Sequence, residues 1–482
     1  MIKCSMSMSI VTLFLVYVIN HTLGYFGTEV NKNDDCFCEL KGSIDDCSCT
    51  VDTVDYFNNK KIFPRLQSLL IKDYFRFYKV DLDRKCPFWV DDSRCAMSHC
   101  HVEACQQEDI PAGLKRMKQR YQDPDQSQTF CDDFDTRLGY LNMSISPAAH
   151  KGFEEWAKHD DAQDNFCLLD EDEPSAQYVD LLLNPERYTG YKGFSANRIW
   201  RSIYMENCFR PKICMNYNSF IPYNALSAQN GMCLEKRAFY RVLSGLHTSI
   251  NIHLCANYLL SDKEQPGFVG PTTGLWGPNI EEFRHRFHPD YTNGEGPHWL
   301  RNLYFIYLVE LRALSKAAPY LLREEYFTGN ESEDKDVKAA ITDLLKVVQS
   351  FPTPFNERTM FNGHTTKLKR EFQHHFQNIS RIMDCVGCDK CKLWGKLQVQ
   401  GLGTALKILF SGKFDSFDEY GIDLVTLGRS KFQLQRTEIV SLFNAFGRLS
   451  TSINELETFR TIKKKGSTYY ISRVIRLHHI VV

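Results

Sequence analysis

The sequence lacks an excess of either charge, because 58 basic residues are balanced by 59 acidic ones and the formal net charge is -1. Proteins that bind nucleic acid usually carry a basic excess, so this balance gives no electrostatic reason to expect a nucleic-acid partner. Apolar residues are not scarce: they make up 43% of the 482 residues, and aromatic residues make up 13%. This composition excludes a broadly disordered chain and predicts a large buried core.

Long hydrophobic runs are missing beyond the N-terminal region, where no apolar stretch reaches the ~20 residues that a membrane-spanning helix needs. The run from Ile10 to Ile19 follows a basic residue and precedes small or polar ones. This pattern predicts a secretory signal peptide over residues 1–24, since the run is too short for the alternative, a membrane anchor. The remaining residues 25–482 are expected to be soluble in the secretory pathway. Three sequons are candidates for glycosylation there, at Asn142, Asn330 and Asn378.

Strands that alternate with helices are also absent from the pattern, as is any internal repeat, so a parallel α/β sheet is not expected. Apolar residues instead recur at the spacing of three and four that is typical of amphipathic helices. Helices are predicted over residues 195–207, 235–260, 299–318, 367–384, 391–410 and 436–461. The expected fold is mainly α, a single helical-bundle domain.

The glycine fingerprint of a Rossmann dinucleotide-binding turn is missing as well. The closest pattern is Gly401-Leu-Gly403-Thr-Ala-Leu406, in which leucine occupies the third glycine position and no strand plainly precedes the motif. A dinucleotide would therefore have to be held in another way, for example between the helices of a bundle.

Cysteine, by contrast, is abundant: there are 18, and 17 remain once Cys4 leaves with the signal peptide. Such usage is typical of an oxidising compartment, and the odd number leaves at least one thiol unpaired or joined to another chain. Four cysteines flank a turn within residues 34–50, namely Cys36, Cys38, Cys47 and Cys49. They predict a disulfide-stapled segment, with zinc ligation as the alternative.

Residues 86–131 combine a polar composition with five cysteines: Cys86, Cys95, Cys100, Cys105 and Cys131. Their turn-forming residues predict a long mobile loop. A disulfide between Cys95 and Cys100 would be exposed there and would exchange readily with an incoming thiolate. From this segment alone an ordinary loop disulfide is the simpler interpretation, and His99 and His101 keep zinc ligation open.

The strongest local signal is the triplet Cys385-Val-Gly-Cys388-Asp-Lys-Cys391. Two intervening residues let the sulfurs of a Cys-x-x-Cys pair meet across one helical turn, and a helix N-terminus lowers the thiol pKa. The spacing therefore predicts a reversible dithiol. Iron–sulfur and zinc sites are alternatives, but neither a fourth cysteine followed by proline nor a matching second Cys-x-x-Cys is present. A purely structural disulfide also stays open.

Three longer stretches carry a resemblance to a known family: Asn184–Gly193, Glu235–Tyr240 with Ser244–His247, and Arg381–Gly395. In them the chain resembles the endoplasmic reticulum oxidoreductin family, the flavin-dependent oxidases that recharge protein disulfide isomerase. It looks close to the animal members across almost the whole of residues 25–482. The resemblance implies a helical bundle that cradles FAD without a Rossmann domain, and a role in oxidative folding.

The resemblance also implies how electrons pass. Cys95 and Cys100 would be the shuttle pair that meets the isomerase, and Cys388 and Cys391 the active-site disulfide, with Cys391 nearer the flavin. Electrons would pass from reduced isomerase to the shuttle pair, then to the active-site pair, FAD and molecular oxygen. Hydrogen peroxide would be the by-product, and a flavin suits the step to oxygen.

The implied flavin contacts are Arg187, Thr189, Trp200, Ser244, His247 and Arg286. Their chemistry suits the role, because arginine pairs with pyrophosphate and tryptophan offers a stacking face. Without the resemblance, core packing would be the simpler interpretation of Trp200 and His247. Trp299 stands where many animal members have a further arginine, and whether Arg301 replaces it stays open.

Disulfide pairings follow from the same resemblance. Cys95 with Cys131 and Cys100 with Cys105 would lock the shuttle in an off state. The structural pairs would be Cys36–Cys49, Cys38–Cys47, Cys86–Cys385 and Cys208–Cys233. Three cysteines then have no assigned partner, namely Cys167, Cys214 and Cys255.

The resemblance places the protein in the lumen of the endoplasmic reticulum. The sequence does not end in a signal of the Lys-Asp-Glu-Leu type, so retention through a partner protein is expected. Peripheral association with the lumenal face of the membrane is a further expectation, and no metal site is expected.

Overall fold

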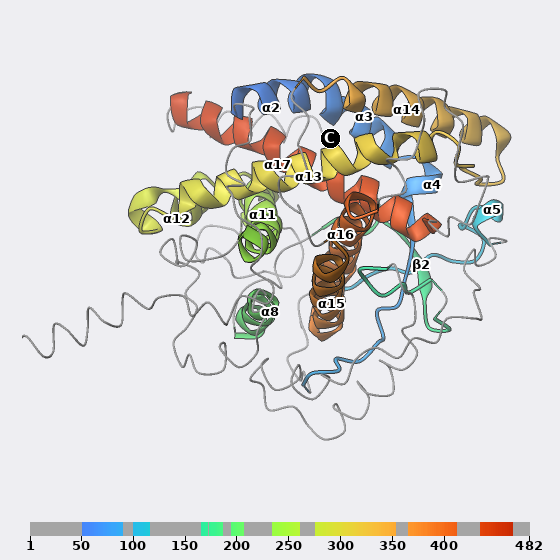
Figure 1. Ribbon diagram of the computed structural model, residues 1–482, viewed down its shortest axis with the longest axis horizontal. Helices are drawn as coiled ribbons and strands as arrows, with labels where there is room; N and C mark the ends of the chain where they lie inside the picture. Colours follow the sequence, from blue (N-terminus) through green and yellow to red (C-terminus); the bar gives the residue numbers. More distant parts are fainter. Residues whose placement is uncertain are drawn as a thin grey trace, which may run out of the picture.

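The computed structural model describes residues 51–89, 100–115, 165–171, 173–186, 194–206, 234–260, 275–352, 365–411 and 434–465. Over these residues the chain forms one mainly helical domain, with two short antiparallel sheets of two strands each (Figure 1). The fold class predicted from the helical spacing is confirmed. None of the described helices is long and apolar enough to span a membrane.

The N-terminal half of the described chain contributes short elements and one longer helix. The helices are α2 (Val51–Phe57), the π-helix η2 (Asn58–Ile62), α3 (Phe63–Leu70), α4 (Asp73–Arg76), α5 (Ala112–Lys115) and α8 (Phe194–Met205). The strands are β1 (Phe77–Val80) and β2 (Gln177–Asp180), which pair with Phe77 opposite Asp180. This sheet matters for the site, because Ala104 forms a bridge with Val179 and so lays the chain around Cys105 against β2.

The C-terminal half contributes the long helices. They are α11 (Leu234–Ala256), α12 (Ile280–Phe287), α13 (Gly296–Leu321), α14 (Glu331–Gln349), α15 (Thr365–Ile382), α16 (Asp389–Leu409) and α17 (Arg436–Lys465). Two 3-10 turns, η5 (Pro289–Tyr291) and η7 (Met383–Cys385), and a hairpin of β3 (Tyr258–Leu260) with β4 (Leu275–Gly277) complete the set. The helices predicted from the sequence correspond to α8, α11, α13, α15, α16 and α17, whereas α5, α12, α14 and the helices of residues 51–76 were not predicted.

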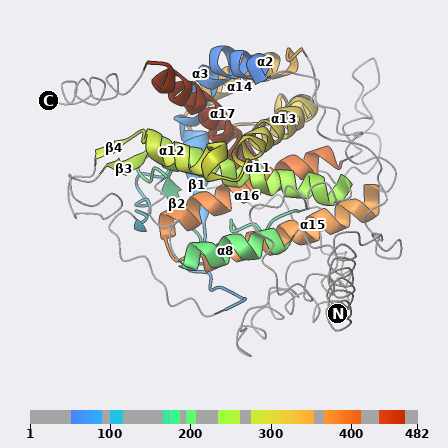
Figure 2. The same ribbon diagram turned by 90° about the vertical axis from the view of Figure 1, so that its left-hand side faces the viewer.

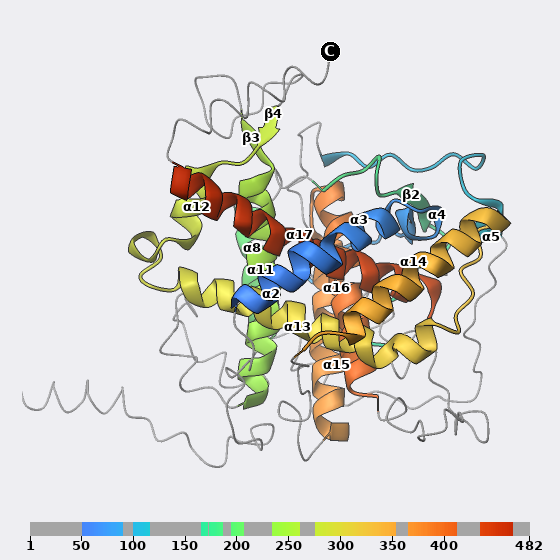
Figure 3. The same ribbon diagram turned by 90° about the horizontal axis from the view of Figure 1, so that it is seen from above.

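The core lies where α11, α13, α16 and α17 cross. Seen from above, α11 and α16 run side by side and α13 and α17 pass over them (Figure 3). Beyond that crossing, α2, α3 and α14 cover one side, and α8 and α15 lie on the other (Figures 1 and 2). The domain therefore has helices on both sides of a fully buried central layer.

The glycine pattern of residues 401–406 lies inside α16 and allows a close helix crossing. A Cβ atom at Gly401 would come within 2.3 Å of the carbonyl oxygen of Ser441 in α17. A Cβ atom at Gly403 would come within 2.6 Å of the sulfur of Cys167. Gly401 thus lets the backbone of α17 approach α16, and Gly403 makes room for the side chain of Cys167. These packing roles agree with rejecting the pattern as a Rossmann turn.

Local capping fixes the helices that carry polar site residues. The side chain of Asn279 accepts a hydrogen bond from the backbone N–H of Glu282 at the start of α12, and two acidic residues follow in the first turn. Both features favour helix initiation at that residue. The next helix, α13, begins with Pro297 in its first turn, a position where the missing N–H costs nothing. These starts set the directions of Arg286 and Trp299.

Candidate redox and cofactor site

The cysteine triplet lies where α15 passes into α16. After η7 ends at Cys385, the chain extends through two residues, and Cys388 occupies the N-cap of α16 with φ of -100° and ψ of 114°. Cys391 follows in the first turn. Cys388 is 2% exposed and Cys391 is 1% exposed. The two thiols are therefore buried together at a helix N-terminus, as the spacing predicted.

Hydrogen bonds make Cys388 unusually acidic. The thiol of Cys391 and the backbone N–H groups of Cys391 and Lys390 donate toward the Cys388 sulfur and hold its pKa below the ordinary value of 9.0. Burial and the nearby carboxylate of Asp389 act in the opposite direction. Donation to a charged sulfur at a helix start outweighs the cost of removing it from water. The lowered pKa favours the thiolate of Cys388, the species that reacts with and leaves from disulfides.

Cys385 does not share this role, because it forms a disulfide with Cys86, 299 residues away in sequence. The pair is the one that the family resemblance implied. Cys385 is 1% exposed, and its bond ties residues 81–86 to the junction of α15 and α16. The triplet is therefore divided into one anchoring cysteine and two thiols.

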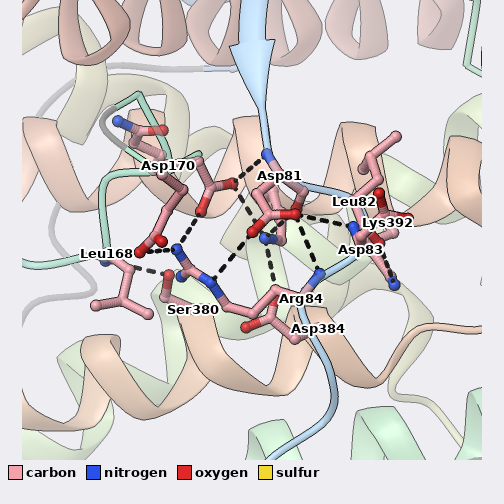
Figure 4. Close-up of polar contacts among 12 residues, drawn as sticks. Asp81, Leu82, Asp83, Arg84, Leu168, Asp170, Ser380, Asp384 and Lys392 are labelled. Carbon is pink, nitrogen blue, oxygen red and sulfur yellow. Dashed lines mark hydrogen bonds and ion pairs between the residues drawn. The ribbon is translucent and has the colours of Figure 1, made fainter. Parts of the chain in front are cut away.

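Buried ion pairs involve residues that neighbour this disulfide in the chain, among them Arg84 and Asp384 (Figure 4). The Nζ of Lys396 lies 2.6 Å from Asp384 Oδ1 and 3.0 Å from Asp170 Oδ2, and it donates to the carbonyl of Asp81 at 2.8 Å. Arg84 extends the group, with Nη2 3.1 Å from Asp170 Oδ1. Burial raises the pKa of Asp384 to about 6, against the attraction of Lys396. Removing one partner would leave a buried charge without compensation, so these pairs fix the position of α16.

The segment from Cys100 to Cys105 lies beside β2. Cys100 is 3% exposed and disulfide-bonded, and no described cysteine is its partner. Cys105 is a half-buried free thiol, so the off-state pair of Cys100 with Cys105 is not formed in this structure. The backbone N–H of Cys105 donates to the carbonyl of Tyr178 at 2.8 Å. Burial, Asp180 and Asp109 raise the pKa of Cys105 to about 11.

A second feature is a cavity of about 390 Å³ between α8, α11, α12 and α13. Its lining includes four of the residues expected to contact a flavin: Trp200, Ser244, His247 and Arg286. The rings of Trp200 and His247 stack with centroids 3.8 Å apart and an angle of 18° between them. The fold thus brings together residues from three separate helices. The first and last of them, Trp200 and Arg286, are 86 positions apart in the sequence.

His247 is neutral in this cavity. Burial and the guanidinium of Arg286 lower its pKa to about 3. Its Nδ1 lies 3.0 Å from the hydroxyl of Tyr204, which fixes the ring against Trp200. A neutral, oriented imidazole beside an indole provides a flat surface and one further polar nitrogen.

Arg286 is held in place by neighbours on α12 and α11. Its Nε and Nη2 donate to Glu282 Oε1 at 2.9 and 2.6 Å, and its Nη1 donates to Asn251 at 2.6 Å. Trp299 also lines the cavity, whereas Arg301 is exposed on α13 and is not among the described lining residues. The structure therefore gives no support to Arg301 as a replacement for the arginine absent at Trp299.

These residues fit a ligand with a flat ring system and an anionic group. Trp200, Tyr204 and Trp299 supply aromatic surfaces, Arg286 supplies a cation, and Ser244 and Asn251 supply polar atoms. A flavin dinucleotide has both parts. Within the described residues the lining includes neither Cys388 nor Cys391.

The sequence patterns did not predict several side chains of these sites. Asn251 lies seven residues after Ser244 on α11, so the helical period could have placed it on the same face. Asp384 and Lys396 gave no such signal, because they lie on different elements, η7 and α16, and Lys396 also pairs with Asp170, far away in the chain. Among the described residues no group of three or more His, Cys, Asp or Glu side chains is arranged to hold a metal ion.

The glycosylation candidates differ in exposure. Asn330 is exposed and caps α14, where its side-chain oxygen accepts hydrogen bonds from Ser332 and Glu333. Asn378 is 2% exposed within α15, and its amide donates to Glu206 at 3.1 Å. A glycan can reach Asn378 only before α15 packs, so the folded structure favours Asn330.

The remaining sequence predictions fall outside the described residues. They concern the signal peptide over residues 1–24, the stapled segment 34–50 with Cys36, Cys38, Cys47 and Cys49, and the positions Cys95, Cys131, Asn142, Arg187, Thr189, Cys208, Cys214 and Cys233. Cys167 and Cys255 are described, and both are buried.

A buried Cys-x-x-Cys pair, acidic at its first sulfur and placed at a helix N-terminus, is the arrangement of a thiol–disulfide oxidoreductase. Comparison with known proteins agrees. The model of the family Endoplasmic Reticulum Oxidoreductin 1 (ERO1) matches residues 61–456. The chain is 56% identical to the Ero1-like protein of Drosophila melanogaster over 477 residues, which covers 95% of this chain and 97% of that protein.

Other relatives extend the match. The chain is 50% identical to human ERO1-like protein alpha over 442 residues, covering 89% of this chain and 92% of the relative. The structure of yeast Ero1p, described as the source of disulfide bonds for oxidative protein folding in the cell, matches with a TM-score of 0.55 and 28% identity. That match covers 86% of this chain and 98% of the yeast chain. The chain therefore belongs to the ERO1 family, and as a member it is an oxidoreductase of oxidative protein folding in the endoplasmic reticulum.

Proposed function

We propose that the protein is an FAD-dependent thiol oxidase that regenerates the disulfide of protein disulfide isomerase. The observation that carries this proposal is the buried pair Cys388 and Cys391, with the Cys388 thiolate stabilised at the N-terminus of α16. A buried dithiol cannot meet a large protein substrate directly. An outer pair is needed, and Cys95 with Cys100 is the pair proposed for it.

Thiol–disulfide exchange between the outer and inner pairs would take place in two steps. A thiolate of the reduced outer pair attacks the Cys388 sulfur of the inner disulfide, which breaks the S–S bond and releases Cys391 as the thiolate. The second outer thiolate then attacks the mixed disulfide and releases Cys388. Two electrons and two protons thereby move inward, and the outer disulfide is re-formed. The lowered pKa of Cys388 favours this release, because a more acidic thiol leaves faster.

The cavity between α8, α11, α12 and α13 is the proposed flavin site. A bound flavin supplies an acceptor for the electron pair and a route to molecular oxygen, with hydrogen peroxide as product. Trp200 and His247 would hold a ring by stacking, and Arg286 would pair with the pyrophosphate. Arg187 and Thr189 are proposed as further contacts. The carboxylate of Glu282 already neutralises Arg286, so the phosphate would have to compete with it.

Further parts of the proposal concern the cell. Residues 1–24 would be removed as a signal peptide, and the protein would remain in the lumen of the endoplasmic reticulum through a partner, with peripheral association with the membrane. Cys131 and Cys105 would take Cys95 and Cys100 in an inactive form. Asn142 and Asn330 are proposed as glycosylation sites, and Asn378 only for the unfolded chain.

The direct test uses the purified full-length protein with reduced protein disulfide isomerase and an oxygen electrode. The protein should be yellow and should consume oxygen. Cys95→Ala should block oxidation of the isomerase but spare turnover of a small dithiol that can reach Cys388. A colourless, folded protein that consumes no oxygen would contradict the proposal, and equal loss with both substrates would contradict the two-pair relay.

A further inference from the structure

Asn184 stands between the two segments that carry the proposed redox pairs. It is fully buried, with 0% exposure, and it follows the turn after β2. Its Oδ1 accepts from the backbone N–H of Glu103 at 2.8 Å, and its Nδ2 donates to the carbonyl of Glu103 at 2.8 Å. Nδ2 also donates to the carbonyl of Asp180 at 3.0 Å. One amide side chain therefore pairs with both backbone groups of Glu103.

The backbone of Asn184 makes the second connection. Its carbonyl oxygen accepts a hydrogen bond from Nε1 of Trp394 at 2.8 Å. Trp394 lies three residues after Cys391, one turn into α16, and Glu103 lies three residues after Cys100. Each contact of Asn184 is thus within three residues of a cysteine of a different pair.

Pairing with both backbone groups of one residue is what a neighbouring β-strand does. Ala104 already bridges Val179, and Cys105 donates to Tyr178. Asn184 extends this pairing by one residue toward Cys100. Glu103 itself is exposed, so its backbone could be hydrated if the amide were lost. Loss of the amide would therefore release the segment locally, without removing the helical core.

We propose that Asn184 is a positioning residue that holds the Cys100 segment in fixed register with the helix that carries Cys388 and Cys391. The proposal rests on the proposed relay between two cysteine pairs. Holding both partners in one geometry makes the thiol–disulfide exchange effectively intramolecular, and a misplacement of about 1 Å can slow such a step by about 100-fold. Trp394 acts with Asn184 as the contact on the helix side.

The experiment compares Asn184→Ala and Trp394→Phe with the unchanged protein. Trp394→Phe keeps an aromatic ring, removes the N–H donor and leaves a smaller side chain. Asn58→Ala is the matched control: Asn58 is also 0% exposed, donates to the carbonyl of Ser450 at 2.9 Å and accepts from its hydroxyl at 2.6 Å, but it joins η2 to α17. It tests the effect of losing a buried asparagine that contacts neither cysteine segment.

Each protein is mixed anaerobically with reduced protein disulfide isomerase, quenched in acid, alkylated and mapped by mass spectrometry. Labels on Cys95 and Cys100 report the outer pair, and labels on Cys388 and Cys391 report the inner pair. In Asn184→Ala and in Trp394→Phe, electron transfer from the outer to the inner pair should slow by roughly tenfold or more relative to direct reduction of the inner pair by a small dithiol. Hydrogen exchange at the Glu103 amide should quicken in Asn184→Ala.

Three results would overturn the proposal. One is an unchanged ratio of the two rates in Asn184→Ala, with faster exchange at Glu103. Another is an equal fall of the ratio in Asn58→Ala, which would show a general loss of stability. The third is that, in the unchanged protein, the inner pair becomes reduced while Cys95 and Cys100 never take up a label. That result would contradict the two-pair relay. It differs from a failure of the Asn184 proposal alone, in which the unchanged protein still shows the relay.

Discussion

Two thiols in this protein differ in acidity in the direction opposite to that expected from their burial. Cys388 is 2% exposed, yet its pKa is lowered, whereas Cys105 is half-buried and its pKa is raised to about 11. Burial is the largest cause of the raised pKa of Cys105, and Asp180 and Asp109 raise it further. Cys388 receives hydrogen bonds from Cys391 and from backbone N–H groups at a helix start, and these outweigh the effect of burial. At Cys388, donors directed at the sulfur therefore decide the direction of the pKa shift.

The largest effect is expected from Cys391, whose thiol hydrogen bond is the main cause of the lowered pKa of Cys388. Cys391→Ala should abolish oxygen consumption, because no inner disulfide can form, and should raise the pKa of Cys388. Cys391→Ser is the matched control: it should be equally inactive, but its hydroxyl can still donate, so the Cys388 pKa should stay low. Oxygen uptake and the pH dependence of Cys388 alkylation measure the two effects. An unchanged Cys388 pKa in the alanine variant would refute the hydrogen-bond explanation.

The next effect is the pH dependence of the two thiols in the reduced protein. At pH 8, a pKa of about 11 leaves about one part in a thousand of Cys105 ionised. The pKa of Cys388 is lowered, so a larger fraction of Cys388 should be ionised at the same pH. Alkylation rates followed by mass spectrometry, each normalised to its own high-pH plateau, should show the lower midpoint at Cys388, and coincident midpoints would contradict this.

A smaller effect concerns stability. Cys86→Ala removes the Cys86–Cys385 disulfide and should lower the free energy of unfolding by about 2–5 kcal/mol. Cys105→Ala breaks no disulfide and should cost under ~1 kcal/mol. Denaturant unfolding followed by circular dichroism measures both. Equal losses would mean that the anchor does not stabilise the start of α16.

The smallest effect comes from single carboxylates near each thiol. Asp389 and Asp109 are both exposed, and each raises the pKa of its neighbouring cysteine. Asp389→Asn should lower the pKa of Cys388 slightly, and Asp109→Asn should lower that of Cys105 slightly. High salt should shrink both shifts. A shift in the opposite direction at either site would contradict the assigned cause.

The sequence predicted the parts of this account that depend on local spacing. Helical periods located α11, α13, α16 and α17, and the Cys-x-x-Cys spacing placed two thiols at one helix start. The family resemblance supplied the Cys86–Cys385 pair and the cavity residues. The helix start predicted a lowered thiol pKa within the Cys-x-x-Cys pair. The raised pKa of Cys105 was not predictable, because it depends on burial and on the carboxylates of Asp180 and Asp109. The ion pairs of Lys396 with Asp384 and Asp170, and the contacts of Asn184, join segments far apart in the chain.

The central claim is that Cys388 and Cys391 receive the electrons. It is tested most directly by mixing the unchanged protein anaerobically with two equivalents of reduced protein disulfide isomerase, followed by acid quench, alkylation and mass spectrometry. The first electron pair would reduce a bound flavin, and the second would stay on the cysteines. The account predicts alkyl labels on Cys388 and Cys391 together that are absent from the untreated protein. New labels confined to Cys95 and Cys100 would contradict it.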